Sequence, residues 1–327
     1  MNREHEPNDS MNPSAPLIAT VPEALAGFRL DQILARLFPH YSRTRLAQWI
    51  RTGRVTADAK CLRPRDRLQG GERVELRPEA FKAPSCAAEP IPLEIRYEDR
   101  HLLIVNKRAG LVVHPGAGNL HGTLVNALLH HFPELAEVPR AGIIHRLDKD
   151  TTGLLIVARS LRSHKQLVDQ LKARAIHREY QALVAGVMQA GGVISVPIGR
   201  HPVQRTRMAV VASGRPAITY YRIETRFPAH TLVRVSLETG RTHQIRVHMA
   251  QLGHPLVGDP VYGGRLRIPK GATGQLVDAL CQFRRQALHA GRLELEHPMN
   301  RQRLYFEVAL PEDMRDLINL LKASSLP

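Results

Sequence analysis

A short charged segment between two apolar ones constrains this chain more than any other feature. Residues 141–158 read AGIIHRLDKDTTGLLIVA, so a charged stretch separates AGIIHRL from GLLIVA. Both flanks are typical of strands. An ionised carboxylate buried without a partner is costly. We therefore expect Asp148 to follow an apolar strand directly and to lie at the mouth of a sheet, near other polar groups.

The residues alone leave two interpretations of this segment open. Asp148 and Asp150 either cap a turn through hydrogen bonds to backbone groups, or one of them is a reactive carboxylate at the end of a strand. The TTG sequence at 151–153 fits a turn equally well. Composition slightly favours the structural interpretation.

A second charged cluster, LETGRTHQIRVH, spans residues 237–248. It predicts a helix over 242–253 with Thr242 as its N-cap. Arg246 lies one position from the apolar stripe of that helix. If its guanidinium reaches inward it needs an anion, either Asp148 or a phosphate; otherwise it is an exposed arginine.

A third candidate is Tyr180, at the start of the strand-like segment REYQALV. Its ring either packs in the core or stacks on a base and offers its hydroxyl. The charge of the chain bears on that choice, because 46 Lys and Arg against 30 Asp and Glu give a net charge of +16. Such a field attracts polyanions, and nucleic acid is the leading partner class.

Other partner and cofactor classes find little support. No stretch approaches the roughly 20 apolar residues that span a bilayer, and no basic amphipathic anchor is present. The three cysteines lie far apart without a CxxC pair, which fits a reducing cytoplasm, and the 17 histidines form no HExxH cluster. We expect no metal, no cofactor and no membrane partner.

The pattern of elements predicts several domains. Residues 1–25 are polar at their start and lack an apolar leader, so we expect a disordered tail. Residues 26–77 form a small basic module, with helices over 29–38 and 43–53. Ser42 is the expected N-cap of the second helix.

The remaining residues predict a linker and a larger domain. Residues 78–92 are rich in Pro and Ala and show no period, as in a linker. From residue 93 to 327, strand patterns mix with helices at 123–132 and 162–174. This mixture predicts a single α+β domain around a mixed or antiparallel sheet.

Several of these segments resemble known families. RLDQILARLFPHYSRTRLAQWIRTGRV is similar to the S4 RNA-binding domain, whose paired helices present basic side chains to folded RNA. The segment HRLDKDTTGLLIVA resembles the catalytic motif of the RluA family of pseudouridine synthases, with Thr152 where Ser is common. REYQALV, TGRTHQIRVHMA with GHPLVGDPVYG, and QALHAGRLELEHP resemble its later motifs, in order.

The resemblance covers almost the whole chain after residue 25. It implies a pseudouridine synthase catalytic domain preceded by an S4-like RNA-binding domain. It also implies that Arg43, Arg45, Arg51 and Arg54 contact phosphates, which position an RNA without specifying its sequence.

The same resemblance implies roles in the site. Asp148 is the catalytic aspartate, and Arg246 pairs with it. Tyr180 stacks on the target base and helps to remove its C5 proton, next to the apolar side chain of Ile245. The target base is flipped out of its stack, and Arg146 fills the vacated space.

Within the family, the motifs are most similar to members that act on large-subunit ribosomal RNA, free or in a precursor particle. The expected targets are uridines in the stem-loop that contacts the decoding region. Members that modify other large-subunit uridines or transfer RNA share every catalytic motif. We expect a monomer, because no coiled-coil heptads appear.

Two rival functions remain at this point. One is an S4-type RNA chaperone or assembly factor with an inactive catalytic domain. The other is a carboxylate glycosidase acting on nucleosides, which needs a second acid within about 5–10 Å of the first. Asp150 is the only obvious neighbour of Asp148 in the sequence.

Overall fold

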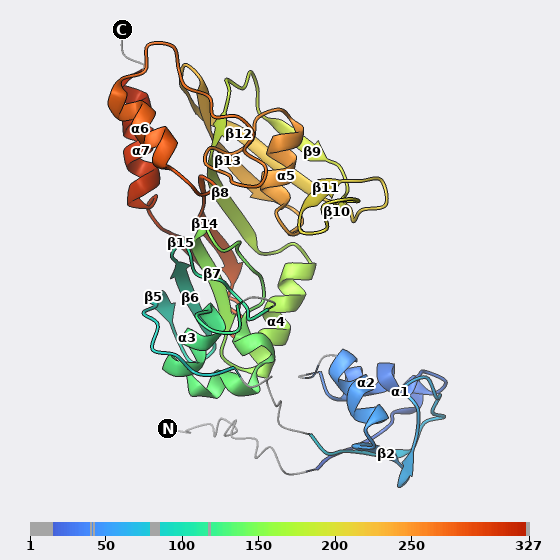
Figure 1. Cartoon of the computed structure of the whole chain (residues 1–327). Coiled ribbons are helices and arrows are strands. Elements are labelled where there is room, and N and C mark those ends of the chain that lie inside the picture. Colours follow the sequence, from blue (N-terminus) through green and yellow to red (C-terminus); the bar gives the residue numbers. More distant parts are fainter. Residues whose placement is uncertain (1–15, 40, 42, 79–85, 117–118, 325–327) are drawn as a thin grey trace. The chain divides into compact units, whose positions relative to one another are not determined.

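The computed structural model describes residues 16–39, 41, 43–78, 86–116 and 119–324 (Figure 1). The chain divides into two compact units, one within residues 1–84 and one within residues 85–327. We call them the N-terminal unit and the C-terminal unit, and each is described by itself.

The N-terminal unit packs two helices on a small antiparallel sheet with the strand order β1-β4-β2-β3. Its elements are β1 (Leu17–Thr20), α1 (Leu30–Leu37), α2 (Arg43–Arg51), β2 (Val55–Ala57), β3 (Lys60–Cys61) and β4 (Arg73–Leu76). The apolar stripes that predicted both helices are buried, with Leu34 on α1 and Trp49 on α2 in one core. The expected N-cap at position 42 lies outside the described residues.

Two predicted boundaries do not hold. Residues 17–20, expected in the tail, form β1 and pair with β4, so that Val21 is buried. Residues 87–91, expected in the linker, are tied to α3 (Leu124–His131) through Asn126. The side-chain amide of Asn126 donates to the carbonyl of Ala87 at 2.7 Å, and the backbone carbonyl of Asn126 accepts from the backbone N–H of Glu89.

The C-terminal unit is built on a mixed sheet with the strand order β5-β6-β7-β14-β8-β13-β12-β9, and β15 also pairs with β14. These strands are β5 (Glu94–Glu98), β6 (Leu102–Lys107), β7 (Thr152–Ala158), β8 (His177–Ala185), β9 (Gly192–Ser195), β12 (Ile218–Arg226), β13 (His230–Leu237), β14 (Leu288–Glu296) and β15 (Arg303–Glu307). A separate hairpin joins β10 (Ile198–Arg200) to β11 (Met208–Val210). The helices are α3, α4 (Leu161–Lys172), α5 (Gln244–Gln251), α6 (Gly274–Gln282) and α7 (Glu312–Ala323). The α+β prediction is confirmed.

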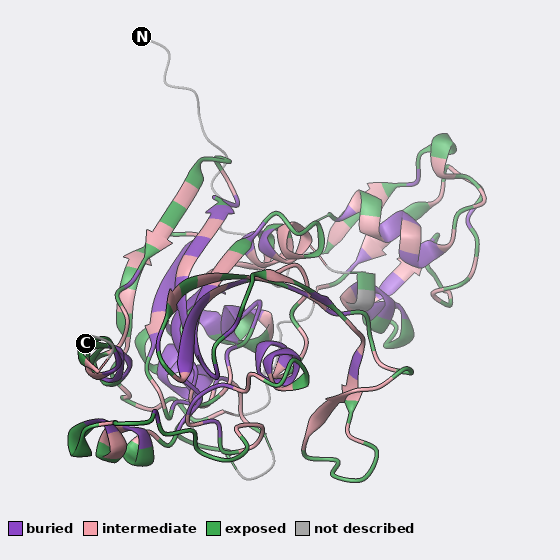
Figure 2. Cartoon of the chain, turned by 90° about the horizontal axis from the view of Figure 1, so that it is seen from above, coloured by how far each residue is buried: buried purple, intermediate pink, exposed green. Residues whose placement is uncertain are grey.

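The middle of this sheet is its most buried part. Every residue of β7 is buried, whereas β5 alternates between exposed and partly buried residues (Figure 2). β14 lies between β7 and β8, parallel to the first and antiparallel to the second (Figure 1). Gly153 allows the parallel contact, because a Cβ at its φ of 113° would lie 2.2 Å from the carbonyl oxygen of Ala290.

The apolar strand expected over residues 141–147 is wrong. Arg140 and Ala141 adopt left-handed backbone angles in a short 3₁₀ segment, Pro139–Gly142. Among the described residues, the stretch 143–147 forms only one isolated β-bridge with β7, between Ile143 and Val157. Asp148 therefore lies in a loop that enters β7. No helix in the described part of the chain is long and apolar enough to cross a membrane.

Candidate active site

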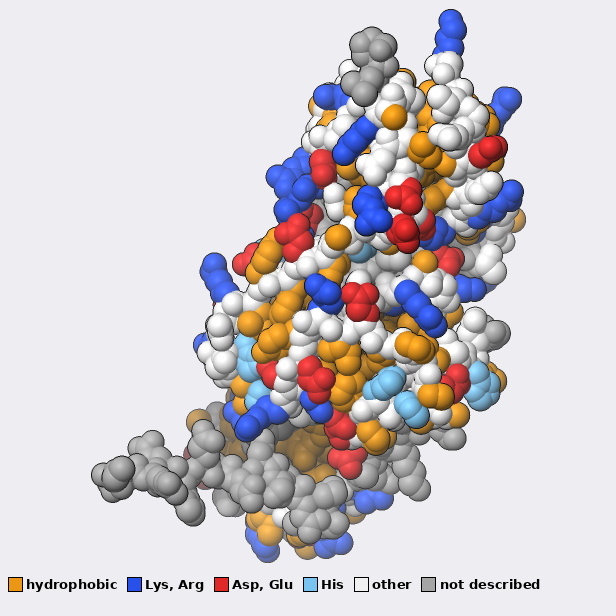
Figure 3. Space-filling model, turned by 90° about the vertical axis from the view of Figure 1, so that its left-hand side faces the viewer, with side chains coloured by type: hydrophobic (Ala, Val, Ile, Leu, Met, Phe, Trp, Pro, Cys, Tyr) orange, Lys and Arg blue, Asp and Glu red, His pale blue; other side chains and the backbone are white. Residues whose placement is uncertain are grey.

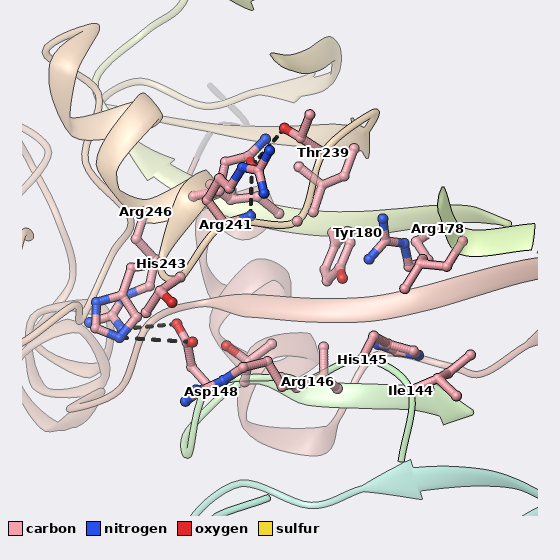
Figure 4. A pocket seen from close by; sticks show the side chains of 18 of the residues that line it. Ile144, His145, Arg146, Asp148, Arg178, Tyr180, Thr239, Arg241, His243 and Arg246 are labelled. Carbon is pink, nitrogen blue, oxygen red and sulfur yellow. Dashed lines mark hydrogen bonds and ion pairs between the residues drawn. The ribbon is translucent and has the colours of Figure 1, made fainter. Parts of the chain in front are cut away.

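A cavity of about 720 Å³ opens in the C-terminal unit beside the loop that enters β7 (Figure 4). The five residues expected in the site, Asp148, Tyr180, Arg246, Arg146 and Ile245, all line it. Tyr180 comes from β8, Arg246 and Ile245 from α5, and the other two from the loop. The fold thus brings Asp148 beside Arg246, which lies 98 positions later in the chain.

Arg246 is held between two aspartates. Its Nη1 donates to Oδ2 of Asp148 at 3.0 Å, the ion pair that the resemblance implied. Its Nε and Nη2 donate to both oxygens of Asp259 at 2.7 and 2.9 Å, a bidentate pair. The side chain of Asp259 is fully buried, whereas that of Asp148 is 16% exposed and faces the cavity.

The charges in this cluster stabilise one another. Burial alone would lower the pKa of Arg246, but the hydrogen bonds and charges of Asp259 and Asp148 outweigh it and raise that pKa. Burial likewise opposes ionisation of Asp259, and Arg246 overcomes it and lowers the pKa of the carboxyl. Arg246 stays charged and Asp259 ionised, so Asp148 always faces a cation.

The start of α5 differs from the prediction. Thr242 is not the N-cap; that position belongs to His243, which adopts a left-handed conformation with φ of 55° and makes no capping hydrogen bond through its side chain. Such conformations are uncommon for residues other than glycine and cluster at functional sites. The backbone angle turns the imidazole of His243 toward Asp148, with Nε2 3.9 Å from Oδ1 (Figure 4).

The loop that carries Asp148 is fixed from the C-terminal part of the chain. The Arg285 guanidinium donates to the carbonyl of Asp150 at 3.3 Å, and the Gln286 side chain donates to Oγ1 of Thr151 at 3.0 Å. Thr152 Oγ1 and His289 Nδ1 lie 2.8 Å apart. The QALHAGRL segment and the arginine before it therefore support the loop that carries Asp148.

Lys107, the last residue of β6, also contacts the loop that carries Asp148. Its fully buried Nζ donates to the carbonyls of Arg108, Leu111 and Lys149 at 2.7–3.0 Å. Burial lowers the pKa of Lys107 to about 7, against the opposing charges of nearby aspartates. Because three carbonyls accept from one ammonium group, the charged form fits this position.

Tyr180 and His145 differ in what they offer to the cavity. The Tyr180 hydroxyl makes no hydrogen bond with another described residue, and burial raises its pKa, so the phenol stays protonated. His145 instead accepts a hydrogen bond from the backbone N–H of Ile156 at 3.1 Å. Burial lowers the pKa of His145 to about 3, which makes it a neutral structural residue.

Cations gather around this cavity. The charged residues among those described in its lining are Arg140, Arg146, Lys172, Arg174, Arg178, Arg241 and Arg246 against Asp148 and Glu238. On the face shown in Figure 3, by contrast, Lys and Arg side chains alternate with Asp and Glu. The cavity therefore concentrates positive charge, which suits a polyanionic substrate.

Besides Asp148, the acid in the described lining of the cavity is Glu238, whose carboxylate accepts from the Tyr220 hydroxyl and pairs with Arg174. Asp259, the second carboxylate bonded to Arg246, is fully buried, and both of its oxygens accept from that guanidinium. Neither carboxylate is therefore a free second acid of the kind that a glycosidase needs. Among the described residues, no group of three His, Cys, Asp or Glu side chains could hold a metal ion.

The arginines predicted to contact RNA belong to the N-terminal unit. Arg51 is exposed on α2. Arg43 is half exposed, but its guanidinium donates to Oδ2 of Asp31 at 2.7 and 2.9 Å and so ties α2 to α1. Arg45 lies over the ring of Trp49, and Arg54 is partly buried at the end of this helical pair.

Sequence reasoning missed Asp259, His243, Tyr262 and Lys107. The motif GHPLVGDPVYG contains two of them, but a GDP sequence looks like an ordinary turn. The signal was a buried arginine that needs more than one anion, which only the three-dimensional arrangement reveals.

Comparison with known proteins identifies both units. Residues 101–251 match the family model of RNA pseudouridylate synthases, and residues 28–74 match the S4 domain. The ribosomal large subunit pseudouridine synthase D of Pseudomonas aeruginosa is 57% identical over 304 residues, which cover 93% of this chain and 95% of that protein. The protein of the same name from Escherichia coli is 52% identical, with 94% of each chain covered.

Solved structures agree. Human RNA Pseudouridylate Synthase Domain Containing 4 superimposes with a TM-score of 0.55 at 26% identity, over 70% of this chain and 93% of that one. Human RNA Pseudouridylate Synthase Domain Containing 1 gives 0.51 at 25% identity, over 73% and 98%. With the motifs in order and relatives matching nearly end to end, this chain belongs to the RluA family of RNA pseudouridine synthases, and it is a pseudouridine synthase that carries an S4 domain.

Proposed function

We propose that this enzyme isomerises uridines to pseudouridine in large-subunit ribosomal RNA, and that its targets lie in the stem-loop that contacts the decoding region. The substrate is either the free RNA or a precursor particle. Two relatives named for the ribosomal large subunit, each matching at least 93% of this chain, support the substrate class. The proposal includes a monomeric enzyme in the cytoplasm.

The observation that carries the mechanism is the position of Asp148 at the cavity, paired with Arg246 at 3.0 Å. Isomerisation breaks the N1–C1′ bond, turns the base and joins C5 to C1′. C5 loses a proton and N1 gains one, so no electrons or phosphates are transferred and no cofactor is needed. The carboxylate of Asp148 either attacks C1′ or removes a proton from the sugar, and in both cases the guanidinium of Arg246, 3.0 Å away, faces its negative charge.

The other lining residues serve the flipped base. Tyr180 and Ile245, both nearly buried, offer a ring and an apolar wall for stacking. Tyr180, whose hydroxyl is protonated, also assists removal of the C5 proton by taking it up while releasing its own proton to water. Arg146 is exposed and lines the cavity, and its side chain can enter the RNA helix and fill the space that the flipped base leaves.

The decisive variant is Asp148→Asn, tested on large-subunit RNA from a strain that lacks this enzyme. We expect pseudouridine formation to be abolished while RNA binding is retained, because the amide keeps the shape but cannot act as a base or nucleophile. Conversion at the wild-type rate would contradict the catalytic assignment. An unchanged modification pattern in cells that carry the variant would favour the assembly-factor function.

Mapping pseudouridines in total RNA from the same strain, with and without the wild-type gene, tests the substrate. We expect losses confined to the decoding-region stem-loop of the large subunit. Losses in transfer RNA, or elsewhere in the large-subunit RNA, would replace the proposed target while leaving the reaction unchanged.

A further inference from the structure

The second oxygen of Asp148 faces a side chain that has no assigned role. Oδ2 is occupied by Arg246, whereas Oδ1 lies 3.9 Å from Nε2 of His243. That separation exceeds a hydrogen bond, but such contacts are often long in substrate-free enzymes and shorten in the reactive complex. The left-handed backbone of His243, φ 55°, aims the ring at this oxygen.

The opposite side of the same imidazole is held by Tyr262. The Tyr262 hydroxyl lies 2.9 Å from Nδ1 of His243, and it accepts a hydrogen bond from the backbone N–H of Met208, also at 2.9 Å. The guanidinium of Arg246 lies 5.0 Å from the centre of the Tyr262 ring. The backbone N–H of Tyr262 donates to Asp259 at 3.0 Å. Tyr262 thus contacts most of the charged cluster.

These contacts fix where the protons lie. Burial lowers the pKa of His243, so its imidazole is neutral at neutral pH, and burial raises the pKa of Tyr262, so its hydroxyl keeps its proton. Since the N–H of Met208 must donate to the hydroxyl, the hydroxyl proton is satisfied by donating to Nδ1 of His243. The remaining imidazole proton is then on Nε2, which faces Asp148.

We propose that His243 and Tyr262 are positioning residues for the isomerisation: Tyr262 orients the imidazole of His243 so that its Nε2–H is presented to Oδ1 of Asp148. Two donors, Arg246 and His243, then fix both oxygens of the carboxylate relative to the sugar. The proposal rests on the assignment of Asp148 as the catalytic carboxylate. It also ties the β10–β11 hairpin, through Met208, to the geometry of the site.

Two substitutions of His243 separate a donor role from a backbone role. Gln places its amide nitrogen near the position of Nε2, whereas Asn reaches only the position of Nδ1. Asn, however, tolerates the left-handed backbone better than Gln. If His243 acts as a hydrogen-bond donor, His243→Gln should retain more activity than His243→Asn. If His243 only holds the backbone conformation, the order of the two variants should be reversed.

The readout is the single-turnover rate at saturating RNA, with RNA affinity measured separately. We expect His243→Asn to lower the rate by about tenfold and His243→Gln by less than about threefold, both with unchanged affinity, as the loss and retention of one hydrogen bond predict. An order of Asn above Gln, or a loss confined to affinity, would overturn the proposal.

Tyr262→Phe tests the other half of the device, because it removes only the hydroxyl and keeps the ring beside Arg246. We expect the single-turnover rate to fall by about threefold to tenfold. Tyr305→Phe is the matched control: it removes the hydroxyl that bonds Glu307 on exposed β15, and we expect no change in rate. Equal rates for both variants would overturn the role of Tyr262.

The outcome for Asp148→Asn keeps the two proposals distinguishable. If that variant is active, the catalytic assignment fails, and the proposal for His243 fails with it. If Asp148→Asn is inactive while His243→Asn keeps the wild-type rate, only the proposal made here fails.

Discussion

Arginine and aspartate meet in a three-membered cluster in each unit, and the two clusters have opposite compositions. In the N-terminal unit, Arg29 and Arg43 share Asp31 at 3.1 and 2.7 Å. The aspartate is buried, and the two arginines are 35% and 50% exposed. The cluster has an excess positive charge that solvent and phosphates can reach.

In the C-terminal unit one arginine, Arg246, is shared by Asp148 and Asp259, and it is only 5% exposed. This cluster has an excess negative charge, and its one accessible carboxylate faces the cavity. Under the proposed function, the same two residue types attract RNA in one unit and provide the reactive carboxylate in the other. The ratio of charges and the depth of burial decide between the two roles.

Removing the buried carboxylate should have the largest effect. Asp259→Asn leaves Arg246 with half of its charge partners, and breaking a buried pair costs about 3–5 kcal/mol. We expect this loss in urea unfolding followed by circular dichroism. The fluorescence of Trp49, the single tryptophan and a core residue of the N-terminal unit, should report an unchanged transition. A shift of the Trp49 transition by the same amount would contradict the independence of the two clusters.

The reciprocal change, Asp31→Asn, should act on the other unit and less strongly. It removes the negative charge and one of the two acceptor oxygens of the residue that ties α1 to α2, where the arginines remain solvated, and hydrogen bonds to charged groups contribute about 1.5–3 kcal/mol. Here the Trp49 transition should move while the single-turnover rate at saturating RNA stays unchanged. A large loss of that rate would show that Asp31 serves catalysis.

The stability of the C-terminal unit should fall in acid because of His145. The folded C-terminal unit holds His145 with a pKa of about 3, below that of an unfolded histidine. Below about pH 6.5 the unfolded state therefore binds more protons, and stability falls as the pH falls. His145 alone should cost about 1 kcal/mol between about pH 6.5 and about pH 5.5.

His145→Gln is the matched variant for this pH dependence, because its amide oxygen can still accept from Ile156 but cannot titrate. We expect a shallower decline of stability with pH, measured by urea unfolding followed by circular dichroism. Because the substitution lies in the C-terminal unit, the Trp49 transition of the N-terminal unit should be the same in variant and wild type at each pH. Equal pH slopes of the circular-dichroism transition for variant and wild type would contradict the prediction.

The smallest effect concerns the exposed arginines. Arg51→Gln should weaken RNA binding a fewfold and lower the slope of log affinity against log salt by about 0.7–0.9, as the loss of one phosphate contact predicts. Arg100→Gln, an exposed arginine outside the cavity lining, is the control and should leave the slope unchanged. Equal slopes for both variants would remove Arg51 from the RNA interface.

Elements that depend on local sequence could be predicted from the residues alone. Both helices of the N-terminal unit follow from local periodicity, since Leu34 and Trp49 belong to regular apolar stripes. The strand at 152–158 follows from its unbroken apolar run. These elements depend on residues that are close together in the chain, so the local hydrophobic pattern predicts them directly.

The features that failed depend on distant residues. The stretch 141–147 has the composition of a strand, but the left-handed Arg140 and Ala141 turn it away from the sheet. Nothing near Asp259 indicates that its partner is Arg246, and Asp148 meets that arginine only across 98 positions. The family motifs indicated the residues that line the cavity, whereas the groups that hold those residues in place could be recognised only in the folded structure.

The placement of β14 has a consequence for how the enzyme is made. This strand comes late in the chain yet lies between β7 and β8, and it contacts the loop of Asp148 through Gln286, just before the strand, and His289, within it. Contacts between residues this far apart close slowly and only after both partners have been synthesised. A nascent chain still on the ribosome, short of residue 286, thus lacks the strand between β7 and β8 and the contacts that hold Thr151 and Thr152 beside Asp148. Competence to modify RNA arrives only with the last part of translation.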